Sequence, residues 1–237
     1  MAFIIPMLGR SSRFFDEGYK LPKYQLEINK MTAFAYAISS FKRYFSADFF
    51  IFLVRSDYEA YEFVNNEVLI SGIKNYKIKV VDYETEGQAD TVSLSLEYMD
   101  NNEPIYIFNI DTYRDNYIKP DFVNICDGYL EVFKGNGDAW SFVLPSGQNR
   151  VIRTTEKDRI SNLCSDGLYF FRNKKIYMNA FNSAKSNNKM VNDEYYIAPI
   201  YNELIRLGMD IRYDLIDINV LKFFGVPKEY QDLISIK

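Results

Sequence analysis

Small and basic residues follow the first apolar run of the chain, at residues 3–5. A short loop leads from this run to Arg13 and the dipeptide Pro22-Lys23. The loop contains Leu8, Gly9, Arg10, Ser11 and Ser12. Its small side chains let backbone N–H groups approach an anion, and Arg13 and Lys23 can neutralise a polyphosphate. The spacing matches neither the Walker loop nor the dinucleotide-binding glycine motif. A plain strand-to-helix loop with surface cations is the alternative interpretation.

A carboxylate follows another apolar run. Asp111 comes directly after residues 105–110, and open α/β sheets bind ligands at the carboxyl ends of their strands. An isolated carboxylate in such a crevice is costly unless a metal or cation shares the site. Asp111 is therefore a candidate ligand for a hard cation, and a cap for the next element is the equally weighted alternative.

Gly87 and Gln88 follow a third apolar run. Gly87 opens room beside a predicted helix start, and the side-chain amide of Gln88 has donors and an acceptor that can read the edge of a nucleotide base. The stretch is short, so by itself it is weak evidence for a nucleotide site.

The composition restricts the chemistry. The 237 residues include no histidine, which excludes Ser-His-Asp and Cys-His catalysis and histidine-ligated zinc. Catalysis must therefore use carboxylates, Lys, Arg, Tyr, backbone dipoles or a hard metal. With 28 basic and 32 acidic residues the net charge is −4, which argues against a general binder of nucleic acid or of an anionic membrane.

The cysteines and the apolar runs indicate a cytoplasmic protein. Cys126 and Cys164 are far apart in the sequence, which fits a reducing compartment better than a disulfide scaffold. We expect Cys164 to be a buried core thiol. Arg10 interrupts the apolar N-terminus before a signal core can form. The longest apolar run, at residues 49–54, has six residues, whereas a membrane span needs roughly 20.

The elements that must position these residues alternate between strands and helices in the first half of the chain. Short β-rich runs occur at residues 3–5, 49–54, 76–81 and 105–108. Their continuous apolar character predicts strands of a parallel sheet covered on both faces. Helical spacing predicts helices over 32–44, over 57–70 with Asp57 as N-cap, and over 89–99.

The second half shows a looser pattern. It predicts short strands at 138–144, 150–154 and 168–171 that form antiparallel hairpins, helices over 174–184 and 195–207, and a final strand at 211–215. The stretch 183–189 reads as a polar loop. No linker or repeat separates the halves, so we expect one α/β domain over 1–237, in which 1–115 binds the nucleotide and 116–237 binds the acceptor.

Five short motifs in this order resemble the nucleotidyltransferase family that makes sugar nucleotides. They are the loop at 6–13, Pro22-Lys23, Gly87-Gln88-Ala89, the strand-end Asp111, and Glu156-Lys157 ahead of Gly167. The segment Tyr195-Tyr196-Ile197-Ala198-Pro199 is similar to the branch found in bacterial capsule and surface-polysaccharide loci. The resemblance spans most of the chain and implies a Rossmann-like, GT-A-like fold: a mostly parallel central sheet flanked by helices, with a small antiparallel β extension.

The resemblance also implies roles for these residues. Arg13 and Lys23 would neutralise the triphosphate and the leaving pyrophosphate, which the loop amides cradle. Gly87 and Gln88 would contact the base, and Asp111 would hold Mg²⁺. The second substrate would bind Trp140, Glu156, Lys157 and Gly167. A core aromatic is the alternative reading for Trp140.

The sequence departs from the family in two places. Ser11 replaces the second glycine of the phosphate loop, and Leu8 stands where a small residue is usual. The C-terminal segment Phe224-Gly225-Val226-Pro227 keeps the Gly and Pro but has no Asp just before them. Asp217 is a candidate replacement as second metal ligand, with a surface or turn aspartate as the alternative.

The resulting expectation is a Mg²⁺-dependent nucleotidyltransferase for surface polysaccharide biosynthesis. It would join a nucleotide from CTP, UTP, GTP or dTTP to a sugar 1-phosphate or similar phosphorylated metabolite and release pyrophosphate. The aromatic-rich composition is compatible with an apolar interface between the subunits of a homo-oligomer. The alternatives are a GT-A glycosyltransferase that uses a nucleotide sugar and a nucleotide-binding regulator without turnover.

Overall fold

The computed structural model describes residues 1–235, which form two compact units. Unit 1 comprises Met1–Ile4, Glu84–Phe108 and Ile118–Ile218. Unit 2 comprises Ile5–Tyr83, Asn109–Tyr117 and Asn219–Lys237. Each unit takes segments from both sides of residue 115, and the assignment of the two sequence halves to nucleotide and acceptor stays a prediction.

Unit 1 is built around strands that combine parallel and antiparallel pairs. They are the start of β1 (Ala2–Pro6), β6 (Ile105–Phe108), β8 (Gly128–Lys134), β9 (Ser141–Pro145), β10 (Val151–Glu156), β11 (Leu163–Phe171) and β12 (Ile211–Ile216). β1 pairs with β6, and β8 with β12, in parallel. β11 is antiparallel to β6, β8 and β9, and β9 is antiparallel to β10. Every residue of β11 is buried, because β11 has strands on both sides and covered faces.

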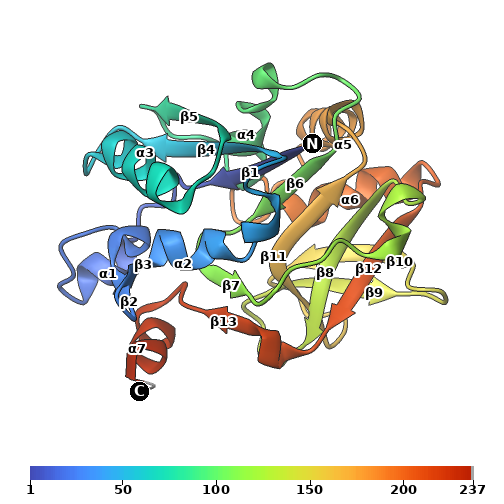
Figure 1. The fold of residues 1–237 in the computed structure, drawn as a ribbon. Helices are drawn as coiled ribbons and strands as arrows, with labels where there is room; N and C mark the ends of the chain where they lie inside the picture. Colours follow the sequence, from blue (N-terminus) through green and yellow to red (C-terminus); the bar gives the residue numbers. More distant parts are fainter. Residues whose placement is uncertain (236–237) are drawn as a thin grey trace. The chain divides into compact units, whose positions relative to one another are not determined.

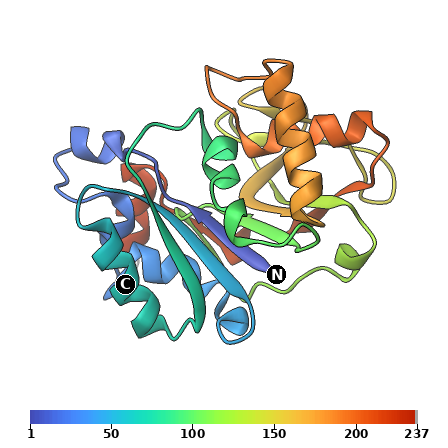
Figure 2. The ribbon, with the colours of Figure 1, turned by 90° about the horizontal axis from the view of Figure 1, so that it is seen from above.

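Helices cover the strands of unit 1. These are α4 (Gln88–Ser93), α5 (Lys174–Ser186) and α6 (Ile197–Arg206), with short 3-10 turns η3 (Leu96–Tyr98) and η4 (Asp121–Asn124). Figures 1 and 2 show α5 and α6, in orange tones, side by side. The Tyr201 ring of α6 stacks on Phe171 with centroids 4.4 Å apart. Its buried hydroxyl donates to the carbonyls of Tyr129 and Phe170, so packing and hydrogen bonds fix α6 on β8 and β11.

Unit 2 contains a parallel pair of strands and several small elements. β4 (Phe49–Arg55) pairs with β5 (Asn75–Val81), and α3 (Ala60–Ser71) packs against both (Figure 1). The other elements are α1 (Ser12–Asp16), η1 (Lys23–Gln25), β2 (Glu27–Ile28), β3 (Met31–Thr32), α2 (Ala33–Ser39), η2 (Lys42–Tyr44), β7 (Thr112–Arg114), η5 (Ile218–Val220, shared with unit 1), β13 (Leu221–Phe223) and α7 (Pro227–Ser235). β13 and β7 pair in antiparallel fashion and bring the C-terminal segment beside Asp111.

The α/β fold class and the strands of the first half are confirmed, with one difference. β4 and β6 have buried interiors, as continuous apolar runs require. β5 is less buried, because Asn75, Lys77 and Val80 are exposed and only Ile78 and Val81 are buried. β5 has only β4 as its strand partner in the described chain, and its side chains are less covered than those of β4.

Several helix predictions were wrong in detail. The helix expected over 32–44 ends at Ser39 and resumes as a 3-10 turn, and the one expected over 89–99 ends at Ser93. α3 begins at Ala60 after a left-handed Glu59, and Asp57 pairs with Arg55 and does not cap the helix. α5 extends to Ser186 and so includes the first four residues of the expected polar loop at 183–189.

Two other sequence expectations concern cysteines and membranes. Cys126 and Cys164 are both free and buried, which confirms the prediction for Cys164. Within residues 1–235, none of the helices has the length and apolar character that a membrane crossing demands.

Candidate active-site residues in the two units

An ion pair joins two of the predicted catalytic residues in unit 2. Lys23 Nζ lies 2.5 Å from Asp111 Oδ2, and the two side chains are 20% and 25% exposed. Asp111 follows β6 as predicted, and Lys23 begins η1, directly after the extended Pro22. The cation and the carboxylate that the sequence placed in one site are therefore in contact.

The predicted phosphate loop lies beside Lys23. Ser11 has a left-handed backbone (φ 54°), and its hydroxyl oxygen accepts a 3.1 Å hydrogen bond from the Lys23 backbone N–H. The Ser11 carbonyl accepts from the N–H groups of Phe14 and Phe15 in α1. A Cβ added at Gly9 would meet no atom within 4 Å, so open space adjoins the loop. Leu8 is half-buried, whereas Arg10, Ser12 and Arg13 are exposed.

Gly225 approaches the Asp111 carboxylate more closely than any side chain would allow. A Cβ at Gly225 would lie 2.9 Å from Asp111 Oδ2, and the Phe224 N–H donates to the Asp111 carbonyl. Glu229 accepts hydrogen bonds from the Gly225 and Val226 N–H groups. Burial raises the pKa of Glu229; those two donors and Lys23 oppose the rise, and Asp111 adds to it. The C-terminal segment thus packs its backbone closely against Asp111 and places an acidic residue near it.

The predicted base loop in unit 1 is held against the segment before α6. Gly87 has φ 116°, and a Cβ there would lie 2.6 Å from the Tyr195 nitrogen. The Tyr195 N–H donates to the Glu86 carbonyl, and the Ala89 N–H donates to the Tyr195 carbonyl. Glycine is required at residue 87 by both its backbone conformation and this close approach. Gln88 begins α4 in the same loop.

Helix α5 holds the same loop from its other side. Lys185 Nζ lies 2.6 Å from Glu86 Oε2 and 3.6 Å from Asp90 Oδ1. The buried Tyr177 hydroxyl donates a 2.6 Å hydrogen bond to the Ala89 carbonyl. These contacts hold the loop against α5 within unit 1.

Glu156 is buried at the end of β10. Its carboxylate accepts a short hydrogen bond from the Ser141 hydroxyl, which lies 3.5 Å from the Tyr169 hydroxyl. Burial raises the pKa of Glu156, which the Ser141 hydrogen bond and the charge of Lys157 oppose. Burial and the Glu156 charge also raise the pKa of Tyr169.

Lys157 contacts the tyrosine-rich segment. Its Nζ donates a 2.9 Å hydrogen bond to the Tyr196 hydroxyl and lies 4.8 Å from that ring's centroid. The hydrogen bond is the main cause that raises the pKa of Lys157. The sequence analysis used Tyr196 only as part of a family motif. Tyr196 directly follows Tyr195, which contacts the predicted base loop. Tyr196 is therefore an additional candidate site residue.

Trp140 and Gly167 have clear structural roles. The Trp140 ring packs edge-on against Phe133 at 5.1 Å, its Nε1 donates to the Asn136 carbonyl, and its carbonyl accepts from the Lys157 N–H. Gly167 has φ 95° at an irregularity in the β8–β11 pairing. Both positions shape the strands that carry Glu156 and Lys157, and direct substrate contact stays a prediction.

Asp217 is exposed at the end of β12 and belongs to unit 1, whereas Asp111 belongs to unit 2. Its role as second metal ligand therefore stays a prediction. Within residues 1–235, no three or more Asp, Glu or Cys side chains form a metal-binding group. A metal at Asp111 would need further ligands from bound phosphates or water.

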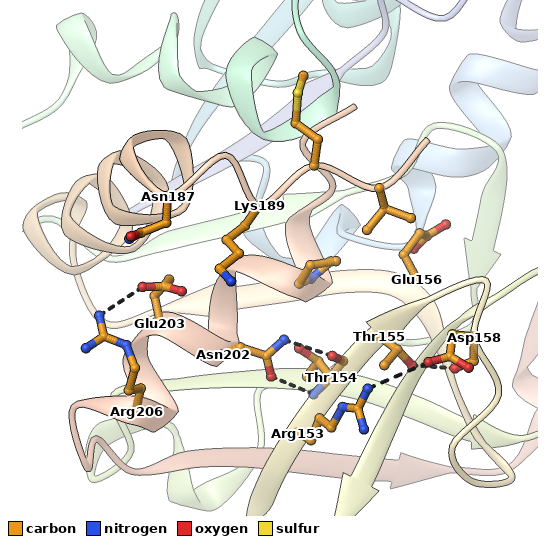
Figure 3. A pocket seen from close by; sticks show the side chains of 13 residues that line it. Arg153, Thr154, Thr155, Glu156, Asp158, Asn187, Lys189, Asn202, Glu203 and Arg206 are labelled. Atoms are coloured by element: carbon orange, nitrogen blue, oxygen red, sulfur yellow. Dashed lines mark hydrogen bonds and ion pairs between the residues drawn. The ribbon is translucent and has the colours of Figure 1, made fainter. Parts of the chain in front are cut away.

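A pocket of about 760 Å³ lies in unit 1 (Figure 3). It is bounded by β10, by the connection between α5 and α6, and by one face of α6. Glu156 lines the pocket, whereas Lys157 is not among its lining residues.

The chain matches a solved structure closely over its whole length. That structure is the nucleoside-diphosphate-sugar pyrophosphorylase from Vibrio cholerae RC9, at 45% identity and a TM-score of 0.95, covering 98% of this chain and 99% of the other. The chain belongs to this nucleotidyltransferase family. The predicted Rossmann-like nucleotidyltransferase fold is thereby confirmed.

More distant structures share the fold. The inositol-1-phosphate CTP transferase from T. maritima is 17% identical with a TM-score of 0.75, covering 99% and 94% of the two chains. A UDP-glucose pyrophosphorylase complexed with UDP-glucose is 12% identical with a TM-score of 0.73, covering 99% and 97%. No protein-family model matches the chain, and the curated proteins contain no match.

Proposed function

We propose that this protein transfers a nucleoside monophosphate from an NTP to a sugar 1-phosphate or a similar phosphorylated metabolite and releases pyrophosphate. The observation that carries the proposal is the Lys23–Asp111 pair beside the Gly9–Ser12 loop. The Vibrio cholerae relative, named as a nucleoside-diphosphate-sugar pyrophosphorylase, supports the same reaction class.

In the proposed reaction, a phosphate oxygen of the acceptor attacks the α-phosphorus of the NTP in line with the departing pyrophosphate. The attacking phosphate is already ionised near neutral pH, so the reaction needs positioning and charge neutralisation more than a strong base. A chain without histidine can carry out such a reaction. Lys23 and Arg13 bind the phosphates, and the loop N–H groups stabilise charge on the leaving group.

The residues around Asp111 fit a magnesium ion. Mg²⁺ prefers oxygen ligands and is held by one or two carboxylates when substrate phosphates complete its coordination. Asp111 offers such a carboxylate, and the glycine at residue 225 keeps side-chain atoms away from it, because a Cβ there would lie only 2.9 Å from Oδ2. When bound, the cation supplies charge neutralisation between the nucleotide and acceptor phosphates.

Unit 1 carries the proposed contacts to the base and the acceptor. The base loop with Gly87 and Gln88 is held by Tyr195, Lys185 and Tyr177. Glu156 would accept hydrogen bonds from acceptor hydroxyls, and Lys157 would pair with the acceptor phosphate. Surface polysaccharide biosynthesis in the cytoplasm is the setting that we propose for the product.

The test is release of pyrophosphate from a panel of CTP, UTP, GTP and dTTP with Mg²⁺ and phosphorylated sugars. Release that requires both an NTP and a phosphorylated acceptor supports the proposal. A GT-A glycosyltransferase would instead consume a nucleotide sugar and release a nucleoside diphosphate. A regulator without turnover would bind an NTP and release nothing.

A further inference from the structure

The pocket in unit 1 has the size of a small-molecule site. Its volume of about 760 Å³ lies within the range of roughly 300–1,000 Å³ that is typical of ligand pockets. Figure 3 shows Lys189, Glu203 and Arg206 at one end, and Thr155, Glu156 and Asp158 at the other. The two ends differ in chemistry.

Two cations flank one carboxylate at the first end. Glu203 accepts hydrogen bonds from the Ser183 hydroxyl and from Arg206, the latter at 3.0 Å. The Ser183 hydrogen bond is the main cause that lowers the pKa of Glu203, and the charges of Arg206 and Lys189 contribute. With both cations charged and Glu203 ionised, this end carries a net charge of about +1. Arg206 is 62% exposed and keeps N–H donors available for an anion.

Hydroxyl and carboxylate oxygens dominate the second end. The Thr155 hydroxyl donates to the Asp158 carbonyl, and both residues line the pocket together with Glu156 (Figure 3). Arg153 and Asp158 are 3.7 Å apart, with side chains 58% and 66% exposed, so this ion pair is weakly held. Asp158 can therefore turn to accept hydrogen bonds from a ligand's hydroxyl groups.

A rigid wall connects the two ends. Asn202 of α6 accepts from the Thr154 N–H at 2.9 Å and donates to the Thr154 carbonyl at 2.8 Å. The Thr154 hydroxyl donates to the Ala198 carbonyl. These bonds fix α6 to β10, so the distance between the cationic end and the hydroxyl-binding end is set in advance.

We propose that this pocket binds a small polyhydroxylated anion, with the chemistry of a phosphorylated sugar, at a second site that adjoins the proposed acceptor site and shares Glu156 with it. The anionic group lies between Lys189 and Arg206, and the hydroxyl groups face Thr155 and Asp158. Lys157, to which the proposed reaction assigns the acceptor phosphate, turns its ammonium to Tyr196 and is absent from the pocket lining.

Isothermal titration calorimetry with glucose 6-phosphate and with inorganic phosphate tests the site. The double variant Lys189→Gln/Arg206→Gln should weaken both affinities about tenfold or more, which corresponds to about 1.4 kcal/mol. Asp158→Asn should lower the affinity for glucose 6-phosphate several-fold and leave the affinity for inorganic phosphate unchanged. Lys175→Gln is the matched control, because Lys175 is an exposed lysine at the opposite end of α5.

Three results would overturn the proposal. They are the absence of binding to the wild-type protein, equal binding to the double variant, and loss of binding in Lys157→Ala alone, which would assign the ligand to the acceptor site. A thermal unfolding curve checks that the double variant is folded, and the single charge reversal Lys189→Glu replaces it if needed. None of these measurements depends on turnover, so a failed nucleotidyltransferase assay would leave the result interpretable.

Discussion

The ammonium of Lys23 and the carboxylate of Asp111 are 2.5 Å apart although 88 residues separate them in the chain. Lys23 follows a proline after the predicted phosphate loop, and Asp111 lies in the turn between β6 and β7. The pair neutralises two charges that the proposed reaction uses separately, one for phosphate and one for a cation. Substrate binding must therefore break the Lys23–Asp111 ion pair, so that Lys23 can contact a phosphate and Asp111 can contact a cation.

Replacement of Lys23 should affect Mg²⁺ and nucleotide in opposite directions. Lys23→Met removes the cation that competes for Asp111, so the nucleotide-free protein should bind Mg²⁺ several-fold more tightly. The same variant should bind NTP more weakly because a phosphate partner is lost. Calorimetric titration measures both affinities, with the exposed Lys20→Met as control. Unchanged or weaker Mg²⁺ binding in Lys23→Met would argue against Asp111 as the metal ligand.

Gly87→Ala should distort the predicted base loop. The added Cβ would lie 2.6 Å from the Tyr195 nitrogen, at a φ of 116° that other residues rarely adopt. The loop and residues 194–196 must then separate, so NTP affinity should fall at least about tenfold and the melting temperature should drop. Gly147→Ala is the control, because nothing lies within 4 Å of its Cβ position and no positive φ applies. Equal NTP affinity in both variants would show that this loop does not bind the nucleotide.

Tyr196→Phe should raise KM for the phosphorylated acceptor while the protein remains folded. The variant keeps the ring under the Lys157 ammonium and loses the 2.9 Å hydrogen bond. Lys157 then becomes more mobile, so KM for the phosphorylated acceptor should rise several-fold while KM for the NTP stays constant. Steady-state kinetics with each substrate varied in turn gives both values. A rise confined to the NTP would reassign Tyr196 to the nucleotide site.

Glu156→Gln should change how stability depends on pH. Burial raises the pKa of Glu156 above its usual 4.5, so the folded state favours the protonated carboxyl. Its contribution to stability is present below pH 4.5 and is lost as the pH rises through the folded-state pKa. Glutamine does not titrate, so the variant should gain stability relative to wild type between acidic and neutral pH. Urea unfolding across this range measures the difference, with the exposed Glu62→Gln for comparison. A constant difference would mean that Glu156 is ionised as easily as an exposed carboxylate.

The sequence predicted the buried parallel strands best. β4 and β6 are continuous apolar runs, and this pattern alone identifies a strand covered on both faces. β8 was missed because Glu131 and Lys134 interrupt its apolar pattern, although Glu131 is buried in the structure. β7 and β13 are each three residues long and depend on pairing with each other. Such short pairs leave no local signal.

The candidate site was predicted unevenly. Motif order led to Lys23, Asp111 and Gly87, whose contacts the structure describes. Gly225 was noted only as the remnant of a motif, and its closeness to Asp111 depends on the β7–β13 pairing. The link between Lys157 and Tyr196 joins residues 39 positions apart. No sequence pattern in a single chain could reveal it.

Pyrophosphate release by matched variants tests the central claim most directly. Wild-type protein with Mg²⁺, the NTP panel and sugar 1-phosphates should release pyrophosphate, and Lys23→Ala and Asp111→Ala should each lower the rate about 100-fold or more. The exposed Lys20→Ala should retain the wild-type rate. Turnover that persists undiminished in both Lys23→Ala and Asp111→Ala would contradict the account, because the reaction would then occur without the pair to which it is assigned.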